Sequence, residues 1–181
     1  MNLSTLFGTY SPYLEFGWVT APSTGPQSVA TANGITALTL NTKIVDTGNN
    51  GDIGSGTGIV GPNTGLTVAG NQIGLKTGTY YYEAGAPIRS VAYQVDQAIM
   101  SLYNVTDSTY ITRGSVQATT YGYTSTLQLK GQFTISSAKV FLMYLLVEGS
   151  VANWSGNQLV TPTNNSSIAD QRTTIKLWKL A

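Results

Sequence analysis

The stretch NQIGLKTGTYYYEAGAPIRSVAYQVDQAIMSLYNVTD, residues 71–107, decides the fold. Between residues 79 and 86 its side chains alternate strictly between two faces, one of which carries Tyr80, Tyr82, Ala84 and Ala86. A period of two in a segment rich in β-forming residues predicts a half-buried strand. Pro87 is expected to end this strand, because proline cannot donate a hydrogen bond to a β-ladder.

Other segments of the chain also have the composition of strands. They are residues 13–20, 35–45, 99–105, 110–117, 126–135, 139–147 and 173–181, with a short hairpin around residues 59–60. No segment shows a convincing helical period, so the sequence predicts an all-β sandwich or jelly roll of about eight strands. Residues 139–147 are apolar on both faces, and we expect a subunit interface to cover the second face.

Length and charge limit the kinds of partner that the protein can have. Its 181 residues are expected to form one domain over residues 28–181, preceded by an arm over residues 1–27. Only 9% of the residues are charged, with nine basic and eight acidic side chains, so a nucleic-acid partner is not expected. A nearly neutral surface favours self-association instead.

The absence of histidine and cysteine excludes much catalytic chemistry. Neither a Ser-His-Asp nor a Cys-His arrangement can be built, and the common zinc sites are excluded as well. We therefore expect no enzyme activity, no cofactor and no metal centre. The N-terminal residues do not resemble a secretion signal, and the longest apolar run, residues 140–147, is too short to span a membrane.

Three polar features of the sequence have the composition of possible sites. The eight carboxylates are scattered, and no pair stands out as the two facing groups that a glycosidase needs. Asp46 and Asp52 lie in an Asn/Gly-rich region where oxygen ligands for Ca²⁺ are an alternative to ordinary Asx turns, the preferred interpretation. Residues 56–61 match GxGxxG, but no helical pattern follows, so no nucleotide site is expected.

Aromatic side chains supply the other candidate sites. In the N-terminal arm, Tyr13, Phe16 and Trp18 form a candidate anchor on a partner protein, the alternative being that the arm packs on its own domain. Polar loops carry the candidate recognition residues Tyr121, Tyr123 and Trp154. Stacking of sugar rings would be one use of these loops, and packing back onto the domain is the alternative.

Five phrases, in this order, resemble the TNF/C1q-like jelly-roll domains of bacteriophage fibre and spike proteins. They are LNT (40–42), NQIGLKTGTYYYEAGAP (71–87), LYNVTD (102–107), GQFTISSAK (131–139) and KLW (176–178). The resemblance runs from about residue 28 to the end of the chain. It implies a jelly roll, a homotrimer and a location on the virion surface.

This sequence departs from the family pattern in residues 93–97 and in a longer segment over residues 48–70, and it has no fibre-shaft repeats. The resemblance therefore implies a virion structural protein: a spike, head fibre or capsid decoration subunit. Its partners would be other copies of itself, other virion proteins bound through the arm, and a host-surface glycan. The alternatives are a receptor-binding tail-fibre tip and a bacterial carbohydrate-binding or adhesive module. The residues expected in the core or the trimer interface are Tyr80, Tyr82, Phe141, Tyr144 and Trp178.

Overall fold

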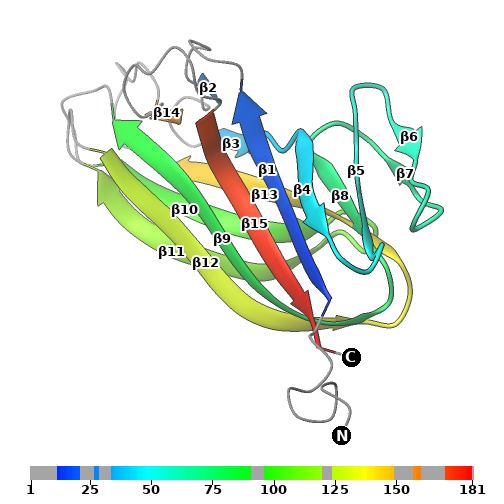
Figure 1. The fold of residues 1–181 in the computed structure, drawn as a ribbon. Coiled ribbons are helices and arrows are strands. Elements are labelled where there is room, and N and C mark those ends of the chain that lie inside the picture. Colours follow the sequence, from blue (N-terminus) through cyan, green and yellow to red (C-terminus); the bar gives the residue numbers. More distant parts are fainter. Residues whose placement is uncertain are drawn as a thin grey trace, which may run out of the picture.

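A computed structural model describes residues 12–20, 27–28, 34–90, 96–119, 124–148, 157–159 and 170–180. In these residues all regular structure is β, and two antiparallel sheets lie against each other as a sandwich (Figure 1). The prediction of an all-β sandwich is therefore confirmed. Within the same residues, no helix is long and apolar enough to cross a membrane.

The first sheet has seven strands, in the order β2-β14-β9-β15-β1-β4, and β12 also pairs with β9. In chain order its strands are β1 (Tyr13–Thr20), β2 (Gln27–Ser28), β4 (Thr42–Asp46), β9 (Gly78–Ser90), β12 (Thr124–Ile135), β14 (Asn157–Leu159) and β15 (Asp170–Lys179). The start of β1 and the end of β15 meet, because the Lys179 amide donates to the Pro12 carbonyl at 2.9 Å.

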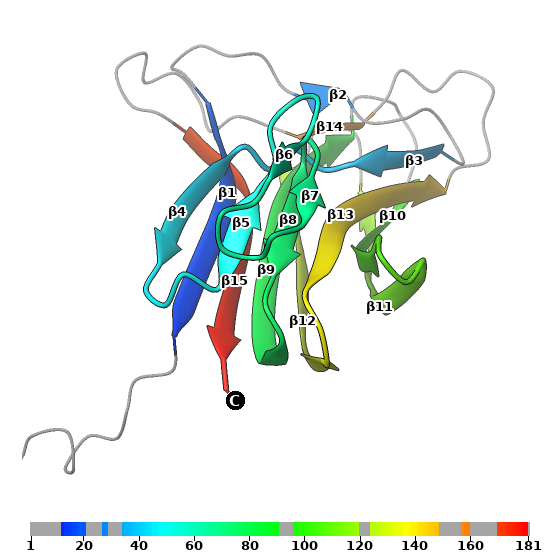
Figure 2. The same ribbon diagram turned by 90° about the vertical axis from the view of Figure 1, so that its right-hand side faces the viewer.

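The second sheet has six strands, in the order β11-β10-β13-β8-β5, and β3 also pairs with β13. Its strands are β3 (Gly34–Ala37), β5 (Gly51–Ile53), β8 (Gln72–Leu75), β10 (Asp96–Asn104), β11 (Thr109–Thr119) and β13 (Lys139–Glu148). A small hairpin of β6 (Ile59–Val60) and β7 (Thr67–Val68) stands beside β5 and β8 (Figure 2).

The core lies between the two sheets, and the strand alternation fills it. Tyr80, Tyr82, Ala84 and Ala86 of β9, which the alternation placed on one face, all point inward, and so do Leu127, Leu129, Phe133 and Ile135 of β12. The second sheet contributes Ala98, Met100, Leu102, Phe141, Met143 and Leu145. Burying a large apolar side chain contributes about 1.5–3 kcal/mol, so this alternation drives the two sheets together.

Two strand predictions are wrong. The strand containing residues 79–86 does not end at Pro87 but continues to Ser90. Pro87 pairs with Thr126 of β12, and the ladder to β15 ends at Gly85, so the missing N–H breaks no hydrogen bond to β15. Residues 35–45 are also not one strand, because the chain leaves β3 in the second sheet and enters β4 in the first.

The N-terminal boundary placed at residue 27 is also corrected. β1 lies inside the seven-stranded sheet, between β15 and β4, and its Leu14 and Phe16 side chains are fully buried in the core. Residues 13–20 therefore belong to the sandwich and do not form a separate arm. Residues 1–11 and 21–26 lie outside the described residues.

Candidate functional site

An aromatic row lies on the outer face of the seven-stranded sheet. Strand register places Tyr13 of β1, Trp178 of β15 and Tyr81 of β9 side by side. Their immediate neighbours in the chain, such as Leu177, fill the core, so the three rings point away from it. The Trp178 ring lies 5.2 Å from the Tyr13 ring and 5.6 Å from the Tyr81 ring, measured between centroids.

A charged row lies directly beside the aromatic row. Register places four side chains of alternating sign across neighbouring strands: Glu15 of β1, Lys176 of β15, Glu83 of β9 and Lys130 of β12. Among the described residues, ion pairs join only Lys43 to Asp46 and Lys139 to Asp107. Glu83 therefore forms no ion pair with the lysine on either side of it.

Tyrosine hydroxyls connect the two rows. Tyr13 donates a hydrogen bond to Glu15 at 2.7 Å, and Tyr81 donates one to Glu83 at 2.9 Å. Burial, and then the bond to Glu15, raise the pKa of Tyr13, while the bond to Glu83 is the main cause of the raised pKa of Tyr81. Both phenols thus stay neutral at physiological pH and hold the carboxylates in place.

A hollow of about 490 Å³ continues this face beyond the charged row. It is lined by Glu83, Ala84, Gly85, Thr126, Gln128, Leu129, Lys130, Thr174 and Lys176. The row that crosses its floor runs from Thr174 through Gly85 to Gln128, and Gly85 contributes no side chain to it. A Cβ placed on Gly85 would meet only ordinary contacts, at 3.7 Å and 3.9 Å, so the space above it is open.

Of the five residues expected in the core or the trimer interface, three lie in the core. Tyr80, Tyr82 and Phe141 are fully buried between the sheets of a single chain and cannot contact a second one. The Tyr80 ring stacks on Phe133 at 5.6 Å, and Phe141 lies 5.1 Å from the same ring. The Tyr82 hydroxyl donates a hydrogen bond of 2.6 Å to the Thr112 hydroxyl, which satisfies it inside the protein.

The other two expected interface residues, Tyr144 and Trp178, are partly exposed but lie on opposite faces. Trp178 belongs to the aromatic row of the first sheet. Tyr144 belongs to β13 of the second sheet and points away from the core, because Met143 and Leu145 on either side of it point inward. A single flat contact surface cannot contain both residues.

The three residues expected to anchor the arm on a partner protein have different environments. Phe16 is buried in the core and is not available to a partner protein. Tyr13 packs on Trp178 within its own chain, in line with the alternative interpretation of this segment. The side chain of Trp18 lies outside the described residues, as do the candidate recognition residues Tyr121, Tyr123 and Trp154.

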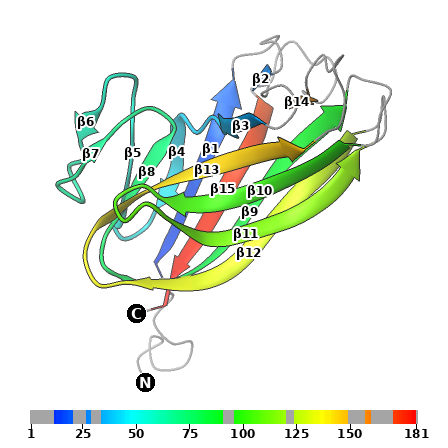
Figure 3. The same cartoon turned by 180° about the vertical axis from the view of Figure 1, so that it is seen from behind.

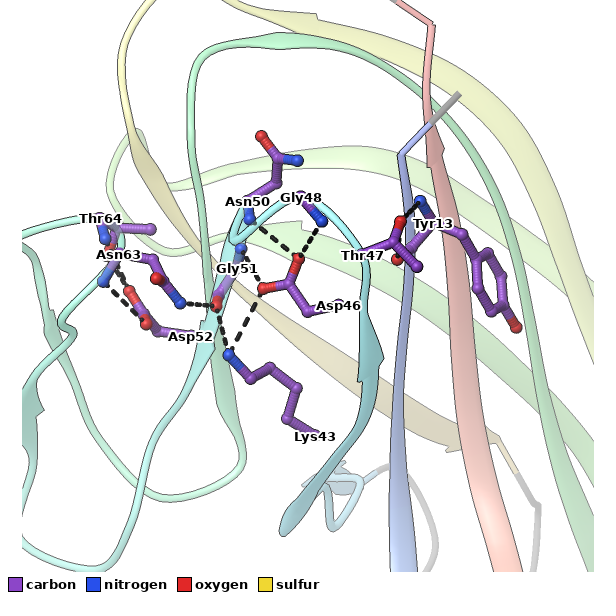
Figure 4. A network of polar contacts seen from close by, with 10 residues as sticks. All are labelled: Tyr13, Lys43, Asp46, Thr47, Gly48, Asn50, Gly51, Asp52, Asn63 and Thr64. Atoms are coloured by element: carbon purple, nitrogen blue, oxygen red, sulfur yellow. Dashed lines mark hydrogen bonds and ion pairs between the residues drawn. The ribbon is translucent and has the colours of Figure 1, made fainter. Parts of the chain in front are cut away.

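The carboxylates weighed as Ca²⁺ ligands serve the turns that surround them (Figure 4). Asp46 accepts hydrogen bonds from the backbone amides of Gly48, Asn50 and Gly51, at 3.3, 2.9 and 3.1 Å. Asp52 accepts from the amides of Asn63 and Thr64, at 3.1 and 2.8 Å, and from the Thr64 hydroxyl at 2.7 Å. Within the described residues, no group of three acidic side chains gathers to hold a metal ion.

The GxGxxG match at residues 56–61 is part of a turn and is not a nucleotide-binding loop. Residues 56–61 form a turn and enter β6, and no helix follows them, so the match lacks the structure on which a nucleotide-binding loop depends.

Sequence reasoning missed Tyr81, Glu83, Lys130 and Lys176 as a group. The alternation placed each of them on one face of its own strand, but only the register of β9, β12 and β15 brings them together.

Comparisons with known proteins bear on the fold. The sequence matches no protein-family model and no curated protein. The structure is similar to murine APRIL, with 11% identity, a TM-score of 0.54, and coverage of 93% of this chain and 98% of that one. It is also similar to Eiger TNF from S. frugiperda, with 8% identity, a TM-score of 0.50, and coverage of 95% and 94%. The chain therefore has a TNF-like jelly-roll fold.

Proposed function

We propose that this protein is a non-enzymatic structural module that assembles as a homotrimer on the surface of a bacteriophage particle. In this role it serves as a spike, head fibre or capsid decoration subunit. The TNF-like jelly roll supports the homotrimer, which the family resemblance of the sequence also implies. The low charge and the five sequence phrases support the virion role.

The observation that carries the proposal is the outer face of β1, β15, β9 and β12. Trp178, between two tyrosines, supplies the kind of aromatic surface that dominates the energy of protein interfaces. Beside it, Glu83 and the two flanking lysines form no ion pair within the part of the chain that the structure describes. Charges of both signs on this face can be paired by a neighbouring copy that places its own charged side chains opposite Glu83 and the two lysines. We therefore assign this face to contact between copies.

The aromatic and charged rows have separate roles in this assembly. Burial of Trp178 and its neighbours supplies most of the affinity. The charged row fixes how the copies align and excludes wrong partners, because like charges that face each other are unfavourable. The Gly85 hollow leaves room for side chains of the next copy, since only small or flexible groups line its floor.

Sedimentation velocity of the purified chain and of two variants tests the proposal. The wild-type chain is expected to sediment as a trimer, and Trp178→Ala as a monomer that keeps its β-rich circular dichroism spectrum. Gly85→Leu, which fills the hollow without a backbone clash, is expected to weaken assembly as well. Val60→Ala is the matched control, because Val60 is 69% exposed on the distant β6–β7 hairpin.

A monomeric wild-type chain over the whole concentration range would overturn the trimer. The virion role has its own test, because labelling of intact particles with an antibody against this chain should decorate their surface. Particles that lack the label while still infecting their host would contradict that part of the proposal alone.

A further inference from the structure

The β6–β7 hairpin projects from the side of the sandwich at which the edge strands β4 and β5 lie (Figure 3). Its strand β6 consists of Ile59, which is 42% exposed, and Val60, which is 69% exposed. No other large apolar side chain in the described part of the chain is as exposed as Val60. The proposed assembly through the outer face of β1, β15, β9 and β12 does not involve this hairpin.

One side of the hairpin is seated on the second sheet, and the other side faces outward. Val68 is fully buried, and Gly74 of β8 allows its close approach, because a Cβ placed on Gly74 would lie 3.1 Å from a Val68 methyl group. Val60 pairs with Thr67, whose side chain points to the opposite side of the hairpin from that of Val68. Because Val68 fixes the inner side, Val60 is held outward.

Hydrogen bonds hold the hairpin in one shape although it is rich in glycine. The Gly61 amide donates to the Leu66 carbonyl at 2.8 Å, and the Gly65 amide donates to the Gly61 carbonyl at 2.8 Å. At the base of the hairpin, the buried Asp52 carboxylate accepts three hydrogen bonds from residues 63–64. A protruding element that is already ordered loses little conformational entropy when it binds a partner.

The hairpin carries no charge. Residues 53–75 contain no acidic or basic side chain. At the base, Asp52 is 2% exposed, and Lys43 is paired with Asp46 at 3.4 Å. Burial of residues 53–75 therefore desolvates no charged side chain, and a charged partner gains no counter-charge from them. An anionic membrane surface is disfavoured for the same reason, because its attraction depends on clustered basic residues.

We propose that the β6–β7 hairpin inserts into an uncharged, apolar groove of another virion protein and thereby attaches the chain to the particle. A convex, ordered tip with β-branched side chains is complementary to a groove of this chemistry, and Ile59 and Val60 are its buried anchors. The inference rests on the proposed function, because it needs a particle to which the chain attaches. The hairpin takes over the role expected of Tyr13 and Phe16, which pack within their own chain.

The experiment compares particles assembled in host cells that supply the wild-type chain, Val60→Asp or Ile35→Asp as the only copy of the chain. An antibody against the chain measures how much of it the purified particles carry. Val60→Asp should lower this amount about tenfold, because the groove offers its charge no partner. Ile35→Asp is the matched control, since Ile35 is 56% exposed on β3, and it should leave the amount unchanged.

Circular dichroism and sedimentation velocity of each purified chain verify that it folds and forms trimers. Val60→Thr keeps the shape of the side chain but adds a hydroxyl to the tip, so it should lower the amount on the particle less than Val60→Asp does. It decides the same comparison if Val60→Asp does not fold.

The inference is overturned if particles carry as much of the Val60 variants as of the wild-type chain, or if Ile35→Asp lowers the amount as strongly. A changed assembly state of the folded Val60→Asp chain would show that the hairpin contacts another copy. Binding of the wild-type chain, and not of Val60→Asp, to phosphatidylcholine vesicles would show a lipid surface; both results overturn the inference. Wild-type particles without the label contradict the virion role itself, so the two failures are distinguishable.

Discussion

Lys176 on β15 lies directly opposite Glu83 on β9, yet these two side chains form no ion pair. Lys130 flanks Glu83 on the other side in the same way. The Tyr81 hydroxyl instead donates a hydrogen bond to the Glu83 carboxylate, and neither lysine forms an ion pair with a described residue. A second copy of the chain can satisfy these charges, so the assembly should respond to salt and to removal of a single charge.

Neutralising this row should weaken self-association without unfolding the chain. Lys176→Gln is expected to raise the dissociation constant of the trimer about tenfold, a loss of about 1.4 kcal/mol, because its contact with a neighbouring carboxylate disappears. Rising salt concentration should weaken the wild-type assembly in the same direction by screening these charges. Sedimentation equilibrium measures both effects. Equal dissociation constants for the wild type and Lys176→Gln at every salt concentration would count against the charged row.

Truncation of Phe141 should reduce the stability of the single chain, whereas truncation of Trp178 should mainly weaken assembly. Phe141 is fully buried, so Phe141→Ala leaves a cavity beside Phe133 and should cost about 3–5 kcal/mol of unfolding free energy. Trp178 is partly exposed on the outer face, and Trp178→Ala should act on assembly much more than on the stability of the single chain. Urea denaturation at a concentration where both variants are monomeric measures the difference. Similar losses of stability in the two variants would contradict this division between core and surface.

Asp52 should stabilise the segment around β5 by itself, without a metal ion. It is 2% exposed and accepts three hydrogen bonds from Asn63 and Thr64. Asp52→Ala should cost about 3 kcal/mol, because it leaves buried donors unsatisfied. Thermal unfolding of the wild type should be the same with added Ca²⁺ and with a chelator. A higher melting temperature in Ca²⁺ would show that the carboxylates bind the ion.

The stability of the chain should decline in alkali. Burial, and then the charge of Asp46, raise the pKa of Tyr80 from 10.0 to about 12. Because the folded-state pKa is raised, the stabilisation is fully present below pH 10 and is lost as the pH rises from 10 to about 12. Tyr80→Phe removes this titration and should make the decline shallower. Urea denaturation across this pH range provides the measurement, and identical slopes for both proteins would refute the assignment.

The sequence predicted the faces of single strands well. The period of two in β9 and β12 places Tyr80 and Leu127 inside and Glu83 and Lys130 outside, because neighbouring side chains in a strand must point in opposite directions. It failed where the answer depends on a partner strand. Whether Pro87 ends β9 depends on where β15 stops pairing, and no local pattern carries that information.

The candidate site was harder to predict, because it consists of rows that cross strands. The sequence does not distinguish an aromatic side chain in the core from one at an interface. Tyr82 and Trp178 differ only in which face of their sheet they occupy, and the fold decides which face points inward. The charged row joins residues from opposite ends of the chain, such as Glu15 and Lys176, and it exists only in the observed register. The ring contacts of Tyr103 with Tyr110 and Tyr144 likewise depend on the pairing of β10 with both β11 and β13.

Sedimentation velocity of the wild-type chain beside Trp178→Ala tests the central claim most directly. Assembly through the outer face of β1, β15, β9 and β12 predicts a wild-type trimer and a folded, monomeric variant. A wild-type chain that remains monomeric, or a Trp178→Ala variant that still forms trimers, would contradict it.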